Sequence, residues 1–238
     1  MATELEKLWI ALLIGQSNMS GRGIVEPQDI AEIPGAYKLN SGGCWVPATD
    51  PLNSDQTKPI GVGPGREFAR TVLNAVPAIE VGLVAAAVGG TTLNQWKPGG
   101  RFYARAMRML GHAKKSGSLR VILWHLGETD ASGTVEAAHS YAERWVKIMQ
   151  RLRQDSGADD IPIIVGKLGG FIDRDHIRII NEQIDLLPKL IDHVSVVSVA
   201  GLKDGGDRLH FDASSQRALG RRYAHALRAN DGETKHRR

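Results

Sequence analysis

The sequence predicts an α/β protein in which a mostly parallel, five-stranded sheet lies between two layers of helices. Short apolar runs of strand length alternate along the chain with longer segments of helical periodicity. The 238 residues, of which 42% are hydrophobic, are enough for one sizeable core, and no repeat or low-complexity linker divides them. We therefore expect a single domain over residues 1–238, with flexible tails at 1–7 and 230–238.

Five runs are interpreted as strands because they are largely apolar, as strands buried on both faces are. They are Leu8–Ile14, Ile79–Val88, Arg120–His125, Ile161–Val165 and Val194–Val199. Between and after them lie segments with apolar residues three and four positions apart, which is typical of helices. These expected helices are Glu67–Ala75, Phe102–Ala113, Thr134–Arg153, Asp175–Leu187 and Ser214–Ala229. The segment Gly21–Gly65 has no clear periodicity and is predicted to be a long functional loop.

The composition argues against several classes of protein. Cys44 is the single cysteine, which excludes an intramolecular disulfide and a zinc site built on thiolates. The eight histidines show no metal-ligand spacing, and we expect neither a metal nor a cofactor. Part of the net charge of +4 comes from the last four residues, so it is weak evidence for a nucleic-acid partner. Leu8–Ile14 is too short for a membrane span and follows acidic residues that make a poor signal peptide, so we expect a cytoplasmic protein with no membrane partner.

Polar and glycine-rich segments follow the strands, which is where ligands bind in open parallel sheets. Gly15–Gly23 follows the first strand, Gly89–Trp96 the second and Gly127–Asp130 the third, and Asp207–Phe211 follows the fifth after a loop. Together they offer a hydroxyl, an imidazole, carboxylates and glycine-rich backbone. These are the parts of a serine-hydrolase site, which needs a nucleophile, a base, an orienting acid and amide donors for an oxyanion.

The order of these segments resembles that of the SGNH/GDSL-like hydrolases. Within them the chain is most similar to the branch of the sialate O-acetylesterases and the acetylxylan esterases of carbohydrate esterase family 6. The blocks that carry the resemblance read GQSNM at 15–19, GGTTLNQW at 89–96, GETD at 127–130 and DRLHF at 207–211. The resemblance spans roughly residues 8 to 228 and implies a flavodoxin-like SGNH hydrolase fold. It also implies a cofactor-free serine esterase whose partner is an acetyl ester of a sugar or oligosaccharide.

The resemblance assigns roles residue by residue. Ser17 matches the nucleophile and His210 the general base. Asp207 matches the usual acid and Glu128 a carboxylate specific to the branch, and either is expected to orient the imidazole. The backbone amides of Ser17 and Gly90 match oxyanion donors. The activity is expected to fall at acid pH as the imidazole protonates.

Two positions depart from the family pattern. Leu126 stands where the family commonly has Gln before the third block, and Thr129 stands where the wider superfamily has an Asn oxyanion donor. Gln16 or Asn18 is therefore the expected substitute for that side-chain donor. Trp96 is interpreted either as core packing or as a platform on which a sugar stacks.

Plainer interpretations of the same residues stay open at the level of sequence. Ser17 could cap a helix, Asp207 could close a turn, and Glu128 could cap the next helix. His125, inside the third strand, is predicted to be a hydrogen-bonded core histidine. Two other functions compete with the carbohydrate acetylesterase: a general short-chain carboxylesterase, and a catalytically inactive carbohydrate-binding module on the same fold.

Overall fold

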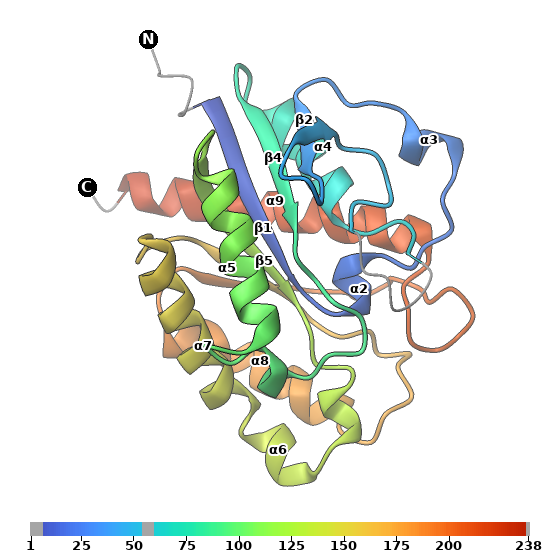
Figure 1. Cartoon of the computed structure of the whole chain (residues 1–238). Coiled ribbons are helices and arrows are strands. Elements are labelled where there is room, and N and C mark those ends of the chain that lie inside the picture. Colours follow the sequence, from blue (N-terminus) through green and yellow to red (C-terminus); the bar gives the residue numbers. More distant parts are fainter. Residues whose placement is uncertain (1–6, 54–59, 237–238) are drawn as a thin grey trace.

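One seven-stranded sheet runs through the computed structural model, which describes residues 7–53 and 60–236 (Figure 1). The strands are β1 (Leu8–Gly15), β2 (Ala36–Leu39), β3 (Trp45–Pro47), β4 (Glu80–Ala85), β5 (Ser118–His125), β6 (Ile163–Gly166) and β7 (Val194–Val197). They are arranged in the order β3-β2-β4-β1-β5-β6-β7, and every pair is parallel except β2 and β3. The α/β class and the mostly parallel sheet are thus confirmed.

The number of strands was predicted wrongly. All five predicted strands are present, but β2 and β3 come from the Gly21–Gly65 segment that we expected to be a loop. β2 is four residues long and β3 three, too short for a period of two to be recognised. β3 pairs only with β2, at the edge of the sheet, so tertiary contact with β4 decides whether this hairpin forms.

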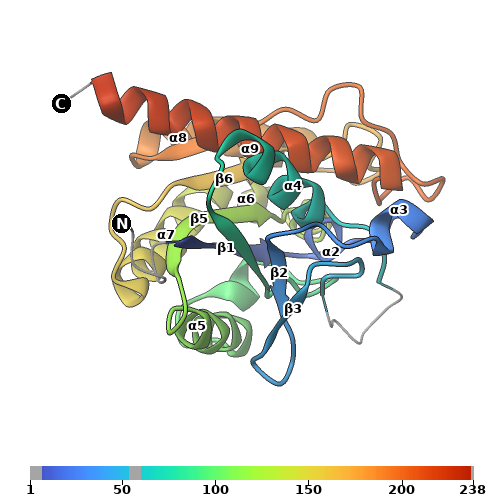
Figure 2. The ribbon, with the colours of Figure 1, turned by 90° about the horizontal axis from the view of Figure 1, so that it is seen from above.

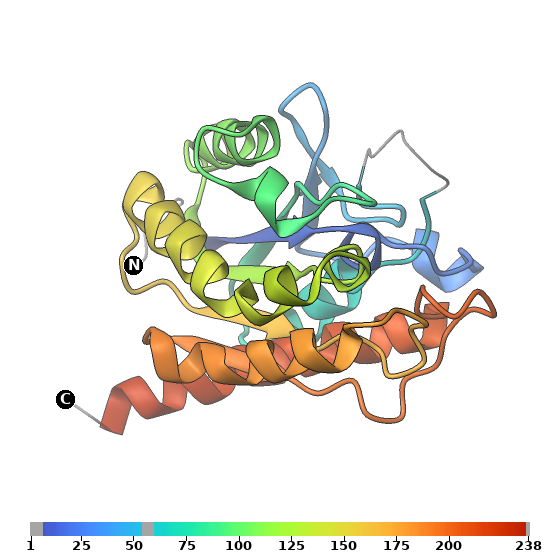
Figure 3. The same cartoon turned by 90° about the horizontal axis from the view of Figure 1, so that it is seen from below.

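Helices cover both faces of the sheet (Figure 2). α4 (Gly65–Ala75) and α9 (Ala213–His236) lie on one face, and α5 (Arg101–Ala113) and α7 (Tyr141–Ser156) on the other (Figure 3), where α8 (Ile177–Leu190) packs beside α7. Alternate residues of β1 enter the two cores. Ile10, Leu12 and Ile14 belong to the cluster under α5 and α7, whereas Ala11 and Leu13 belong to the cluster under α4 and α9. This explains the continuous apolar run of β1.

Two helices differ from the expectation. The helix expected over Thr134–Arg153 is divided into α6 (Val135–His139) and α7, with Ser140 between them. The side chain of Ser140 bonds back to the carbonyl of Ala137, which competes with the helical ladder. The last helix runs to His236, so residues 230–236 continue a helix where a tail was predicted.

Shorter elements complete the chain: α2 (Ser17–Ser20), α3 (Pro27–Ile30), and the 3₁₀ turns η1 (Leu93–Trp96) and η2 (Asp130–Ser132). Three of these follow the carboxyl ends of the central strands β1, β4 and β5, which meet at one edge of the sheet. None of the helices in the part of the chain that the structure describes is both long enough and apolar enough to cross a membrane.

Candidate active site

Ser17 lies on a sharp turn directly after β1. The turn depends on Gly15, whose φ is +144° and where a Cβ atom would lie 2.0 Å from the carbonyl oxygen of His125 in β5. Because glycine has no side chain, the chain can leave β1 and enter α2 within two residues, and a larger residue would not fit here. Ser17 is the first residue of that helix, and its backbone N–H has no acceptor within the helix.

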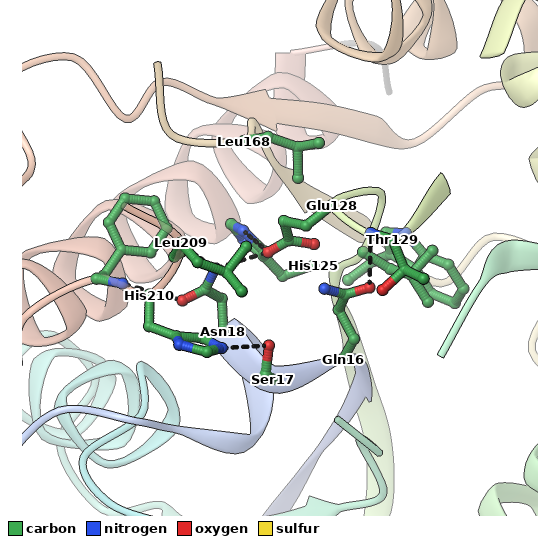
Figure 4. Close-up of polar contacts among 12 residues, drawn as sticks. Gln16, Ser17, Asn18, His125, Glu128, Thr129, Leu168, Leu209 and His210 are labelled. Carbon is green, nitrogen blue, oxygen red and sulfur yellow. Dashed lines mark hydrogen bonds and ion pairs between the residues drawn. The ribbon is translucent and has the colours of Figure 1, made fainter. Parts of the chain in front are cut away.

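His210 reaches Ser17 from the loop that precedes α9 (Figure 4). Its Nε2 atom lies 3.0 Å from Ser17 Oγ, and its Nδ1 atom lies 2.5 Å from Asp207 Oδ2. A carboxylate can only accept, so Nδ1 carries the hydrogen and Nε2 is left to accept the hydroxyl of Ser17. This tautomer is the one that a general base needs.

Backbone hydrogen bonds from the same loop hold the carboxylate of Asp207 in place. Its Oδ1 atom accepts from the backbone N–H of Leu209 at 2.9 Å and of His210 at 2.7 Å. Burial acts to raise the pKa of Asp207, but the hydrogen bonds from the backbone and the ring of His210 outweigh it and lower the pKa below its ordinary value. The carboxyl group is therefore ionised at neutral pH and can stabilise an imidazolium ion.

Glu128 lies apart from His210 and bonds to Asn18 instead. Asn18 Nδ2 donates to Glu128 Oε1 at 2.6 Å and to the carbonyl of Leu209 at 3.1 Å, and Asn18 Oδ1 accepts from Phe211 N at 3.1 Å. The side chain of Asn18 is fully buried and its amide hydrogens have acceptors in the protein. Asn18 is therefore wrong as a substitute oxyanion donor, and the carboxyl group that contacts the imidazole at Nδ1 is that of Asp207.

Glu128 and His125 form a second buried pair behind Asn18. Burial raises the pKa of Glu128 to about 7, although the hydrogen bond from Asn18 acts in the opposite direction. Burial lowers the pKa of His125 to about 3, so the ring is neutral. His125 Nε2 lies 3.5 Å from Glu128 Oε1, and His125 Nδ1 lies 3.1 Å from the hydroxyl of Tyr223. The structure confirms His125 as a core histidine.

Gln16 remains as the candidate side-chain oxyanion donor. Its Oε1 atom accepts from the backbone N–H of Thr129 at 3.4 Å, which fixes the direction of the amide. Figure 4 shows its nitrogen turned to the side on which Ser17 and Glu128 lie. Thr129 thus orients Gln16 rather than replacing the missing Asn with its own side chain. Gly90, the other expected donor, is exposed in a turn with φ of +73°, and a Cβ there would meet no atom within 4 Å.

Trp96 was assigned to the substrate site as one of two alternatives, and that alternative is wrong. The ring is 1% exposed, packs against Trp124 with centroids 6.0 Å apart, and donates from Nε1 to Thr91 Oγ1 at 3.0 Å. A sugar cannot stack on a ring that the core covers. Leu126 is also fully buried, so this departure from the family pattern falls in the core.

Within residues 7–53 and 60–236, no group of three or more His, Cys, Asp or Glu is arranged to hold a metal ion. Cys44 is a free, exposed thiol. Asp207, His210 and Ser17 are joined by contacts of 2.5 Å and 3.0 Å.

Comparison with known proteins decides the family. A family model described as "carbohydrate esterase, sialic acid-specific acetylesterase" matches residues 7–229, which is nearly the whole chain. The chain belongs to this family. The carbohydrate esterase resemblance that the four sequence blocks carried is therefore confirmed.

Relatives agree with this membership. A probable carbohydrate esterase of Arabidopsis thaliana is 31% identical over 243 residues, covering 93% of this chain and 90% of the relative. A crystal structure of a protein from Arabidopsis thaliana matches with a TM-score of 0.87 at 28% identity, covering 94% of this chain and 99% of that one. The crystal structure of NanS matches with a TM-score of 0.79 at 17% identity, covering 98% and 100% of the two chains, and supports the fold.

The sequence placed Asn18 correctly in the site of this carbohydrate esterase family member. It was wrongly expected to be an oxyanion donor, because its amide hydrogens bond to acceptors within the protein. Its partners are 110 to 193 residues away in the sequence: Glu128, Leu209 and Phe211. The available signal was its place next to Ser17 in the first block, and that signal does not say which way the side chain points.

Proposed function

We propose that this protein is a serine esterase that hydrolyses O-acetyl esters of carbohydrates. The observation that carries the proposal is the continuous contact from Ser17 Oγ through the His210 ring to Asp207 Oδ2, at 3.0 Å and 2.5 Å. A buried serine hydroxyl, an imidazole that can accept its proton and an ionised acid in this order form an activated nucleophile. Membership of a carbohydrate esterase family supports the substrate class.

The reaction proceeds in two halves. The Ser17 hydroxyl transfers its proton to His210 Nε2 as Oγ attacks the acetyl carbonyl carbon, and Asp207 stabilises the imidazolium that forms. The N–H groups of Ser17, Gly90 and Gln16 Nε2 stabilise the oxyanion. His210 then gives the proton to the sugar oxygen, which leaves as an alcohol. Water, deprotonated by His210, attacks the acetyl-serine and releases acetate.

A cleft of about 660 Å³ adjoins the catalytic loop and has room for the alcohol part of the substrate. Its lining includes both His210 and Asp207, together with Arg22, Ile24 and Asp204. Charged groups that bond to hydroxyls, beside an exposed apolar side chain, suit the mixed surface of a sugar. Family members include sialic acid-specific acetylesterases by name, and a neighbour of low identity is an acetylxylan esterase of Geobacillus stearothermophilus. Both acetylated sialic acids and acetylated xylan are therefore substrates to test.

The test is hydrolysis of 4-nitrophenyl acetate by the wild type and Ser17→Ala, with Ser20→Ala as the matched control. Ser20 is a buried serine of the same one-turn helix. Turnover by the wild type and Ser20→Ala but not by Ser17→Ala supports the serine esterase. A wild type without turnover on this ester and on the acetylated sugars favours the inactive carbohydrate-binding module. Rates that rise with acyl chain length favour the general carboxylesterase.

The chain is further proposed to act as one domain. A single sheet connects residues 8 to 197, and helix α9 returns from the carboxyl end of the chain to pack against α4 and β6. Limited proteolysis should therefore give one resistant fragment that retains both Ser17 and His210.

A further inference from the structure

A fully buried carboxylate lies near the catalytic histidine without touching its ring. Glu128 is 1% exposed, and its Oε1 atom lies 2.6 Å from Asn18 Nδ2 and 3.5 Å from His125 Nε2. The mechanism above has no proton-transfer step for this group, since Asp207 already occupies the acid position beside His210. Burial of an ionisable group costs free energy, so a role for the buried carboxyl group of Glu128 has to be sought in its contacts.

Asn18 connects Glu128 to the backbone on both sides of His210. The amide nitrogen bonds to the carbonyl of Leu209, and the amide oxygen accepts from the N–H of Phe211. One side chain thus holds the residues immediately before and after the histidine. Figure 4 shows Asn18 between Glu128 and the strand of backbone that carries His210.

The same side chain is also joined rigidly to the nucleophile. Asn18 follows Ser17 in the one-turn helix α2, so Ser17 and the Asn18 side chain that bonds to Leu209 and Phe211 belong to one rigid element. Gly205, Gly206, Asp207 and Arg208 of the histidine loop are exposed, and the bond from Gly205 N to the carbonyl of His210 lies within the loop. Asn18 adds bonds that anchor Leu209 and Phe211 to the helix that carries Ser17.

Glu128 adds a third partner to the Asn18 amide. An asparagine amide can rotate by 180°, exchanging its oxygen and nitrogen. Glu128 Oε1 accepts from Asn18 Nδ2 at 2.6 Å, which reinforces the orientation that the carbonyl of Leu209 and the N–H of Phe211 require. In the reversed orientation, the amide oxygen would face both the carboxylate and the carbonyl of Leu209.

We propose that Glu128 is a positioning residue that acts through Asn18 to hold the His210 backbone at hydrogen-bonding distance from Ser17. This inference rests on the proposed esterase function and adds to it a role for the branch-specific carboxylate. The role requires a hydrogen-bond acceptor at position 128 and does not require a charge that acts on the imidazole.

The experiment compares Glu128→Gln with Glu128→Leu in steady-state hydrolysis of 4-nitrophenyl acetate. Gln keeps an oxygen that accepts from Asn18, whereas Leu fills similar space and accepts nothing. We expect kcat to fall about 10²-fold in Glu128→Leu, the cost of misplacing a catalytic group by about 1 Å, with KM unchanged. In Glu128→Gln we expect kcat within about fivefold of the wild type, since one hydrogen bond is only weakened. Asp50→Asn, which changes a buried carboxyl group outside the site, serves as the matched control and should leave kcat unchanged.

Asn18→Ala and the double variant Asn18→Ala/Glu128→Leu test the connection itself. If Glu128 acts through Asn18, the double variant loses no more activity than Asn18→Ala alone. Additive losses, a Glu128→Gln as impaired as Glu128→Leu, or a folded Glu128→Leu with wild-type kcat would each overturn the proposal. If Glu128→Leu does not fold, Glu128→Met, whose thioether is at most a weak acceptor, replaces it. A kcat about 10²-fold below the wild type in Glu128→Met supports the proposal, and a wild-type kcat overturns it.

Proton NMR separates failure of this inference from failure of the proposed function. The His210 Nδ1 proton, held 2.5 Å from Asp207, should give a low-field resonance in the wild type whether or not the protein hydrolyses an ester. We expect this resonance to persist in Glu128→Gln and to broaden or move upfield in Glu128→Leu. An identical resonance in both variants would overturn the positioning role, whereas a wild type without esterase activity would overturn only the proposed function.

Discussion

Replacing Asp207 by asparagine changes a carboxylate that contacts the imidazole of His210, the proposed general base. The substitution keeps the size of the side chain, and its oxygen can still accept from the backbone of Leu209 and His210. It removes the negative charge that faces His210 Nδ1 at 2.5 Å. The nitrogen of asparagine can also donate to Nδ1, which selects the tautomer that cannot accept the serine proton.

The expected size of the effect depends on the exposure of Asp207. Loss of the acid in a fully buried triad lowers kcat about 10⁴-fold. The Asp207 side chain is 51% exposed, so water already screens part of its interaction with an imidazolium ion. A charge-assisted hydrogen bond is worth up to about 3 kcal/mol, and about 2.7 kcal/mol corresponds to 10²-fold in rate. We therefore expect Asp207→Asn to lower kcat about 10²-fold, with KM within about twofold of the wild type.

Stopped-flow or steady-state hydrolysis of 4-nitrophenyl acetate measures this loss, and Asp173→Asn is the matched control. Asp173 is an exposed carboxylate whose Oδ2 atom lies 3.3 Å from Arg208 Nη2 on the loop of Asp207, and it is not among the residues that line the cleft. A loss confined to Asp207→Asn locates the effect at the imidazole. The reasoning would be refuted by an Asp207→Asn variant within about fivefold of the wild type while Glu128→Gln loses about 10²-fold, because Glu128 would then be the acid.

Three further predictions follow from the geometry. Gln16→Ala should lower kcat about 10²-fold with little change in KM, because an oxyanion donor contributes about 3 kcal/mol, and a change confined to KM would contradict that role. Trp96→Ala should destabilise the protein by about 3–5 kcal/mol in urea denaturation while the folded fraction keeps its kcat, and a selective rise in KM for sugar esters would instead indicate substrate contact. Burial raises the pKa of Asp50 to about 7 from the ordinary value of 3.8, so the folded state binds the proton more tightly. The free energy of unfolding should fall as pH rises from about 4 to about 7, and this slope should be shallower in Asp50→Asn; an equal slope in both proteins would exclude Asp50 as its source.

The amino-acid sequence by itself determined the central strands of this protein and the local turns at its site. The continuous apolar runs of β1 and β5 predict central strands because such runs are stable only when both faces are covered. Gly15, Ser17 and Asn18 belong to one block whose tight turn follows from the lack of a side chain at Gly15. Asp207 and His210, three residues apart, could be joined into one local turn from their spacing alone.

The tertiary structure decided what depends on partners distant along the chain. Whether Asp207 or Glu128 orients His210 is set by how the loop before α9 lies against α2, and no local pattern encodes that placement. The directions of Asn18 and Gln16 follow from acceptors and donors more than one hundred residues away. Trp96 became core because α5 and β5 close over it, and β2 and β3 are too short to be recognised before they pair beside β4. Local periodicity reports which surface is buried, but hydrogen bonds across the sheet edge determine which side chain meets which.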